Sequence, residues 1–322
     1  MLDMTSENNF PIINKAYNAV YKPNRLSLGL VVPIENYATS PVPGMANHVE
    51  RVKLAESLGF EAIWLRDVPF NVPSFGDAGQ TFDPFTYLGF LAAHTKHIAL
   101  ATGSIILPLR HPAHVAKAAA SVDVLSNGRL IMGVASGDRP EEYPAMNLPF
   151  ENRGERFRES FAYIQQMWLE NPDFQNDFGN SNGHMDMLPK PSNGKLPLLI
   201  TGASQQSPDW LAKNGDGWIT YPRNVSTQSA IINEWRSRTQ DAELSIKPAS
   251  QSLYIDLTER PDEAPSPIHL GFRSGTKYLI DYLKSLEEIG MNHVAINLRF
   301  NRNDIEETLK QISEEILPKF TQ

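Results

Sequence analysis

The stretch LLITGASQQSPDWLAKNGDGWITY, residues 198–221, has the pattern of a strand, a sharp turn, a helix and a second strand. Its first apolar run, 198–200, leads into the small residues 201–204, and a helical pattern begins near Ser207. The free N–H groups at the start of a helix favour an anion such as phosphate. An ordinary tight turn with a capping residue explains the same small residues, and from this stretch alone it is the simpler interpretation.

Strand-like and helical patterns alternate along the rest of the chain in the same way. Apolar, β-rich runs occur at 26–33, 61–67, 98–108, 129–138, 196–201, 216–221, 251–257 and 291–300. This alternation implies parallel strands joined by right-handed crossovers. Eight such units in a chain of 322 residues fit a closed (β/α)8 barrel, a TIM-like α/β fold, better than a doubly wound sheet.

Small or polar residues end three of these strands, at 102–104, 135–137 and 202–204. In a (β/α)8 barrel the active site forms at the C-terminal ends of the strands. The three ends would therefore converge on one mouth, which strengthens the phosphate interpretation of the turn at 201–204. Tyr221, at the end of another strand, is the aromatic residue that we expect at this mouth.

The composition limits the classes of function. With 41% hydrophobic residues the chain can form a substantial core, and its net charge of -8 argues against a nucleic-acid or anionic-membrane surface. The sequence has no cysteine, which excludes disulfides, zinc–thiolate sites, iron–sulfur clusters and thiol nucleophiles. Residues 1–10 show no signal-peptide pattern, and no apolar stretch is long enough to span a bilayer. We expect a soluble, cytoplasmic protein with no nucleic-acid or membrane partner.

The domain organisation predicted from these patterns is an irregular N-terminal extension, 1–25, followed by a single barrel over 26–322. A polar stretch rich in glycine and asparagine, 171–194, predicts a hairpin or another excursion from the barrel. The proline-rich segment 258–269 is either a lid over the mouth or a plain surface connector. The chain contains no Walker loop, no GxGxxG and no GxSxG, so nucleotide hydrolysis, Rossmann-type binding and serine esterase chemistry have no motif support.

Four stretches together resemble the bacterial-luciferase-like superfamily of flavin- and deazaflavin-dependent oxidoreductases. They are AESLGFEAIWLRD, ATGSIILPLRHPAHVAKAAASVDVLSNGRLIMGVASGD, ENRGERFRESFAYIQQMW and LLITGASQQSPDWLAKNGDGWIT. The combination of TGSIILPLRHP with SNGRLIMGVASG is specific, whereas each piece alone is weak. The resemblance implies a TIM-like barrel that holds a reduced flavin at its mouth.

The resemblance also implies positions for the cofactor. Gly103 and Ser104 correspond to the small pair beneath the flavin ring, often joined by a non-proline cis peptide. Ala135 and Ser136 correspond to residues along the flavin and its phosphoribityl chain. Other cofactor positions follow the same strand ends, and Ser207 doubles as a simple helix cap; they are Leu65, Thr102, Gly202, Ala203, Ser204 and Ser207.

Two candidates for catalysis follow. Luciferases proper carry a histidine near the end of the second strand, but Asp67 stands at the matching place here. An acid imitates a near-neutral imidazole only where burial raises its pKa, so aldehyde-dependent light emission is not implied. His111, beyond the third strand, is a candidate proton donor, while Arg110 beside it could equally be a structural ion-pair partner. No metal site is expected, because HxH and HExxH are both missing from the sequence.

The charged run 138–142, after the fourth strand, is expected to form a solvated loop, with positions at the mouth as the alternative. The predicted function is a flavin-dependent monooxygenase that uses reduced FMN and O2 to oxygenate a small organic substrate. A separate flavin reductase would supply the reduced FMN, and a homodimer is expected by analogy.

Two other functions remain open. One is hydride transfer with the deazaflavin coenzyme F420, whose long acidic tail would want a basic exit groove. The sequence shows no Lys/Arg cluster near the expected mouth, and this favours FMN. The other is a non-catalytic flavin-binding barrel.

Overall fold

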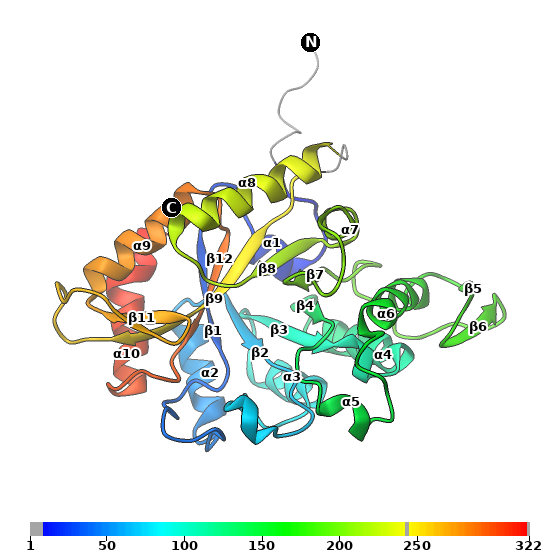
Figure 1. Ribbon diagram of the computed structural model, residues 1–322, viewed down its shortest axis with the longest axis horizontal. Coiled ribbons are helices and arrows are strands. Elements are labelled where there is room, and N and C mark those ends of the chain that lie inside the picture. The colour runs from blue at the N-terminus through cyan, green and yellow to red at the C-terminus, as the bar shows by residue number, and fades with distance from the viewer. Residues whose placement is uncertain (1–8, 242–244, 321–322) are drawn as a thin grey trace, which may run out of the picture.

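The computed structural model describes residues 9–241 and 245–320, and within them eight parallel strands close into a barrel (Figure 1). In spatial order these are β1 (Ser27–Val31), β2 (Ala62–Leu65), β3 (Ala99–Ile106), β4 (Leu130–Ala135), β7 (Leu198–Thr201), β8 (Gly217–Thr220), β9 (Ala249–Leu257) and β12 (His293–Asn297). The pairing of β12 with β1 completes the ring, because β9 already joins β8 to β12. The predicted (β/α)8 barrel is confirmed.

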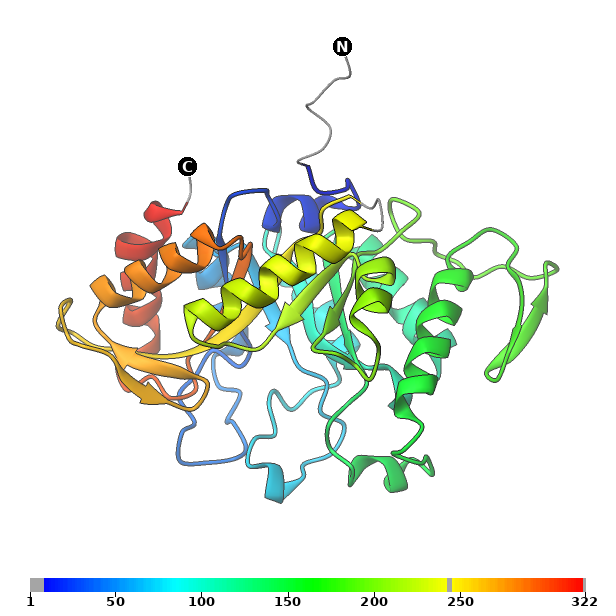
Figure 2. The same ribbon diagram turned by 45° about the horizontal axis from the view of Figure 1, so that its top comes forward.

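Each barrel strand is followed by a helix that covers the outside of the ring (Figures 1 and 2). These helices are α2 (His48–Ser57), α3 (Pro84–His94), α4 (Pro112–Leu125), α6 (Arg153–Met167), α7 (Pro208–Asn214), α8 (Val225–Asp241), α9 (Thr276–Glu288) and α10 (Ile305–Gln311). Short helical pieces complete the chain, namely α5 (Glu142–Ala145), η1 (Pro73–Phe75), η2 (Leu107–Leu109), η3 (Ile312–Ile316) and η4 (Leu317–Lys319). Across the described parts of the chain, no helix combines the length and apolarity that crossing a bilayer requires.

The core has two layers because side chains alternate between the two faces of each strand. On β2, Ile63 and Leu65 point outward and pack among the covering helices. Ala62 and Trp64, from the same strand, point into the barrel. Burial of both layers stabilises the fold, at about 25 cal/mol per Å² of apolar surface.

The segment before β1 closes the N-terminal end of the barrel. It contains the helix α1 (Lys15–Val20), whose Tyr17 and Val20 are fully buried together with Tyr21. The side-chain amide of Asn14 donates to the carbonyl oxygen of Leu130, at the start of β4, over 2.8 Å. The expectation of an irregular extension is therefore wrong at α1. A helix of six residues has too little periodicity to be recognised in the sequence, and tertiary packing stabilises it.

Two hairpins extend from the barrel. The stretch 171–194 contains β5 (Asp173–Asn176) and β6 (Gly179–Asn182), which pair antiparallel and project at the right of Figure 1. The segment 258–269 leads through β10 (Ser266–Ile268) into β11 (Gly271–Ser274). Because β11 pairs with β9, this second hairpin lies against the barrel wall near the C-terminal end of that strand.

Candidate functional site

A cavity of about 410 Å³ opens at the C-terminal ends of the barrel strands. Its volume falls in the range of small-molecule sites, and its place is where (β/α)8 barrels carry their active sites. It is lined by eight of the residues expected to bind a cofactor: Gly103, Ser104, Ala135, Ser136, Gly202, Ala203, Ser204 and Tyr221. The strand ends that the sequence singles out thus converge on one concave surface.

The cavity floor is made by Gly103 and Ser104, which are joined by a cis peptide bond. A side chain at Gly103 would begin 3.3 Å from the indole ring of Trp64, so glycine keeps this surface flat and open. The Ser104 hydroxyl group makes a hydrogen bond with the hydroxyl group of Thr201 on β7. A planar ring could lie close to the backbone at this point.

The turn after β7 presents backbone donors. Gly202, Ser204 and Gln205 have left-handed backbone conformations, with φ of 56°, 45° and 60°. In the described structure, the N–H groups of Ser204 and Gln205 donate to no protein acceptor. The Ser204 hydroxyl group donates to the carbonyl oxygen of Thr201 over 2.8 Å, so its proton is already in use. Clustered free backbone N–H groups of this kind form anion-binding concavities.

Arg153, at the start of α6, adds a positive charge to the same end of the cavity. A side chain at the next residue, Gly154, would begin 2.6 Å from the Cβ of Gln205, so α6 starts in contact with the turn. The Arg153 guanidinium stacks 3.7 Å from the ring centroid of Phe150, and its Nε has no partner among the residues described. The sequence pattern shows Arg153 only as one of several arginines on an amphipathic helix.

Asp67 lines the cavity, but its carboxylate is fully engaged. Oδ2 accepts from Nε of Arg110 at 2.8 Å and from the backbone N–H of Ile106 at 3.1 Å. Oδ1 accepts from Nη2 of Arg110 at 2.7 Å, and the Asp67 side chain is 1% exposed. The structural role considered for Arg110 is confirmed. Asp67 fixes the end of β3, and both of its carboxylate oxygens already have donors from the protein.

His111 does not lie in the cavity, which corrects the expectation that it stands near the mouth as a proton donor. It caps α4, where Nδ1 accepts from the backbone N–H of Ala113 at 3.3 Å. Its ring packs edge-on against Phe178 of the β5–β6 hairpin and against Tyr163 of α6. The η2 turn between β3 and α4 carries His111 outside the barrel mouth.

Three residues expected at the cofactor also lie elsewhere. Leu65 faces the outer apolar layer, because its neighbours on β2 face inward. The Thr102 hydroxyl group donates to the carbonyl oxygen of Gly133 over 2.8 Å and is buried between β3 and β4. Ser207 is the cap of α7, and its Oγ accepts from a backbone N–H of that helix. Sequence position near a strand end does not fix the direction of a side chain.

The charged run after β4 supplies cavity residues in place of a solvated loop. Glu142 is 2% exposed, lines the cavity and has a buried oxygen, Oε1, without a hydrogen-bond partner in the described residues. Burial raises the pKa of Glu142 to about 7. Arg139, 7% exposed, stacks 3.9 Å from the ring centroid of Phe75 and donates from Nη2 to the carbonyl oxygen of Asp77. The sequence shows the charges but not their burial.

At the base of the cavity, His293 is held in one neutral form. The indole N–H of Trp64 donates to its Nε2 over 2.9 Å, so Nδ1 carries the proton and donates to Ser27 Oγ over 2.7 Å. Burial lowers the pKa of His293 to about 3. This histidine is therefore an element of the cavity wall and no proton donor at neutral pH.

Comparisons with known proteins agree with this geometry. The family model for luciferase-like monooxygenases matches residues 26–321. The chain is 31% identical over 166 residues to the oxygenase component of flavin-dependent trigonelline monooxygenase from Acinetobacter baylyi, covering 51% of this chain and 42% of that protein. It is 27% identical over 222 residues to F420-dependent glucose-6-phosphate dehydrogenase from Amycolatopsis mediterranei, covering 67% of this chain and 66% of that protein.

Among solved structures, the monooxygenase RslO1 from Streptomyces bottropensis has a TM-score of 0.75 at 18% identity, covering 92% of this chain and 100% of that chain. At this identity the likeness shows the fold alone. The family model, by contrast, spans nearly the whole sequence. The chain belongs to the luciferase-like monooxygenase family.

Proposed function

We propose that this protein is an FMN-dependent monooxygenase acting on a small organic substrate. The observation that carries the proposal is the cavity itself. It joins a flat floor at Gly103 and Ser104 to a turn with free N–H groups at Ser204 and Gln205. A planar ring with a phosphate-bearing chain fits these two features together.

The cofactor fits the unpaired groups on the protein. The turn and Arg153 offer donors and a positive charge to phosphate, and Ala135 and Ser136 leave room for the ribityl chain between floor and turn. When bound in its reduced state, FMN would react with O2 and supply the oxygen atom, with a separate reductase as its source. The chain's own residues orient the ring and limit the access of water.

The charge of the cavity wall bears on the choice between FMN and F420. The expectation of no arginine cluster near the mouth is wrong, because three arginines line the cavity: Arg66, Arg139 and Arg153. They make F420 the second candidate. However, Arg66 is paired with Asp77 at 2.7 Å, and three acids share the wall: Asp67, Asp138 and Glu142. Asp67 is likewise paired with Arg110, and Glu142 is only partly ionised at neutral pH. The described wall therefore carries a small net positive charge and no basic groove for a long acidic tail, and this supports FMN.

The choice can be tested by titrating the purified protein with reduced FMN and with reduced F420 under anaerobic conditions. Tight binding of FMN, followed by oxygen-dependent product formation in a substrate screen, is the expected result. Binding of F420 alone would replace oxygen chemistry with hydride transfer. Stoichiometric FMN without oxygenation of any substrate would favour a non-catalytic flavin-binding barrel.

The phosphate site is tested by Ser204→Asp. A carboxylate placed at the turn should weaken FMN binding by tenfold or more, because two negative charges about 4 Å apart repel each other by roughly 4 kcal/mol near a protein surface. Binding of riboflavin, which lacks the phosphate, should change much less. Equilibrium titration followed by flavin fluorescence measures both.

Ser207→Ala is the matched control. Ser207 caps α7 outside the cavity, so its loss should cost about 1 kcal/mol of stability and leave FMN affinity unchanged. Equal FMN affinity in wild type and Ser204→Asp would remove the phosphate site from this proposal.

A further inference from the structure

Two acids in the cavity wall differ sharply in their surroundings. Both oxygens of Asp67 accept hydrogen bonds, from Arg110 and from the backbone of Ile106. Glu142 is buried to a similar extent, yet its Oε1 accepts no hydrogen bond from any residue that the structure describes. A buried carboxyl group that serves structure alone is normally satisfied in the way that Asp67 is. Oε1 of Glu142 needs a hydrogen-bond partner that the described residues do not supply.

The cavity is the route by which such a partner reaches Glu142. The residue is 2% exposed and belongs to the cavity lining together with Ser136 and Arg139. Its position is well fixed, because α5 begins at Glu142 and the neighbouring Tyr143 hydroxyl group donates to the carbonyl oxygen of Ser136. This contact ties α5 to the end of β4.

The groups that shift the pKa of Glu142 come from two loops, the one after β2 and the one after β4. Burial raises its pKa to about 7, and this exceeds the opposing effect of the Arg139 guanidinium. The carboxylate of Asp67, in the loop after β2, and that of Asp138, in the loop that leads to Glu142, raise the pKa further. The backbone N–H of Phe70, from the loop after β2, lowers it. At neutral pH both the acid and the carboxylate are populated, which is the condition for efficient proton exchange.

We propose that Glu142 is the acid–base residue of this cavity, exchanging a proton with the ligand bound above Gly103 and Ser104. The proposal rests on the proposed function, because it takes that ligand to be the flavin. In the acid form the carboxyl O–H bond breaks, the proton goes to an oxygen or nitrogen atom of the ligand, and the carboxylate remains. The reverse step removes a proton from a ligand hydroxyl group. No electrons move in either step, and water resets the carboxyl group.

The titration of Glu142 is tested without any ligand by infrared difference spectroscopy across neutral pH. A protonated-carboxyl band with a midpoint near pH 7 is expected in the wild type and should vanish in Glu142→Gln. The matched control is Glu141→Gln, because the neighbouring Glu141 is exposed and outside the cavity lining. Persistence of the band in Glu142→Gln, or its midpoint at an ordinary value near 4, would overturn the proposal.

Contact with the ligand is tested by the pH dependence of the dissociation constant for oxidised FMN. The FMN phosphate itself titrates near pH 6, so the quantity to compare is the difference between wild type and Glu142→Gln. If the ratio of the two dissociation constants changes several-fold as the pH passes through 7, Glu142 contacts the bound FMN. If Glu142→Gln does not fold, Glu142→Asp keeps an acid at the site and should shift the midpoint without abolishing it.

The outcomes separate this inference from the proposed function. If FMN binds tightly and the difference is flat across neutral pH, Glu142 does not touch the ligand and only the present inference fails. If neither FMN nor F420 binds, the proposed function fails and the ligand contact fails with it. The infrared result stands by itself in both cases.

Discussion

At the scale of single residues, the role of each polar side chain in the cavity wall depends on whether the protein supplies all of its hydrogen-bond partners. His293 has hydrogen-bond partners on both ring nitrogens, and Asp67 has them on both carboxylate oxygens. Oε1 of Glu142 has no such partner in the described residues. The first two therefore shape the cavity, while the third is available to a ligand. Burial alone does not distinguish these roles, because all three side chains are almost inaccessible to solvent.

His293 should make the protein sensitive to acid. Its pKa is about 3 in the folded state and near 6.5 when unfolded, so between these values the unfolded chain binds a proton that the folded chain does not. Stability is complete above pH 7 and falls on acidification, by about 2 kcal/mol from this residue between pH 7 and pH 5. Urea unfolding at both pH values measures the loss.

His293→Gln should remove this part of the acid sensitivity, because glutamine does not titrate. The control is His184→Gln, since His184 is exposed and its substitution should leave the pH dependence as it is in wild type. The same acid sensitivity in wild type and His293→Gln would contradict the neutral, buried state of this histidine.

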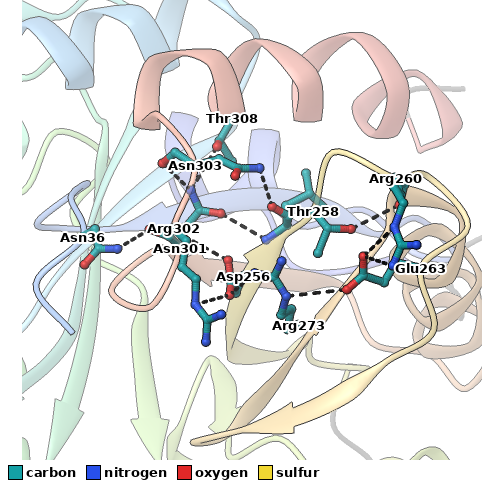
Figure 3. A network of polar contacts seen from close by, with 11 residues as sticks. Asn36, Asp256, Thr258, Arg260, Glu263, Arg273, Asn301, Arg302, Asn303 and Thr308 are labelled. Carbon is teal, nitrogen blue, oxygen red and sulfur yellow. Dashed lines mark hydrogen bonds and ion pairs between the residues drawn. The ribbon is translucent and has the colours of Figure 1, made fainter. Parts of the chain in front are cut away.

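At the scale of elements, the hairpin formed by β10 and β11 is fastened to the barrel by Asp256, near the end of β9. Figure 3 shows Asp256 between Arg273 of β11 and Arg302 of the loop after β12. The carboxylate accepts from Arg273 at 2.6 Å and from the backbone N–H of Arg302 at 3.0 Å, and its side chain is 1% exposed. Leu270, at the tip of this hairpin, lines the cavity. We propose that the hairpin and the segment 258–269 before it cover the cavity.

Asp256→Asn should loosen this cover, because one partner of a buried ion pair is removed. A cost of about 1–3 kcal/mol is expected, and amide hydrogen exchange in residues 266–274 should speed up by tenfold or more. The control is Glu263→Gln, whose side chain lies 3.6 Å from Arg273 in a more exposed pair, so its loss should leave the exchange rates close to those of wild type. Equal exchange rates in the two variants would refute the fastening role of Asp256.

At the scale of the whole molecule, the two ends of the barrel have different tasks. The N-terminal end is sealed by residues 10–21, whereas the C-terminal end holds the cavity. Tyr17 is fully buried in this seal, and its hydroxyl group donates to the carbonyl oxygen of Asp216 over 2.8 Å. A homodimer stays a prediction, which sedimentation analysis can decide.

Tyr17→Ala should lower the free energy of unfolding by roughly 3–5 kcal/mol through the cavity that it leaves. FMN affinity, measured where the variant remains folded, should stay within about twofold of wild type, because the proposed binding site lies at the other end of the barrel. Tyr278→Ala is the control, since Tyr278 is 38% exposed. A parallel loss of FMN binding in Tyr17→Ala would show that the two ends are coupled.

The sequence by itself determined the barrel and much of its mouth. Strand and helix periodicities can be recognised from the spacing of apolar residues alone. Small residues at a strand end, such as Gly103 and Ser104, indicate a place where a ligand can approach the backbone closely. These signals are local, so eight residues of the cavity lining could be found without knowing what packs beside them, while their contact with a cofactor stays a prediction.

Tertiary structure alone decided which long or charged side chains enter the cavity. Leu65 turns outward because its neighbours on β2 fill the barrel, and His111 is carried away by a short turn. Oε1 of Glu142 is left without a hydrogen-bond partner because none of the described residues around it offers a donor to that atom. The partner of a charged group comes from segments distant in sequence. No periodicity along the chain therefore shows which charged groups will be paired and which will be left without a partner.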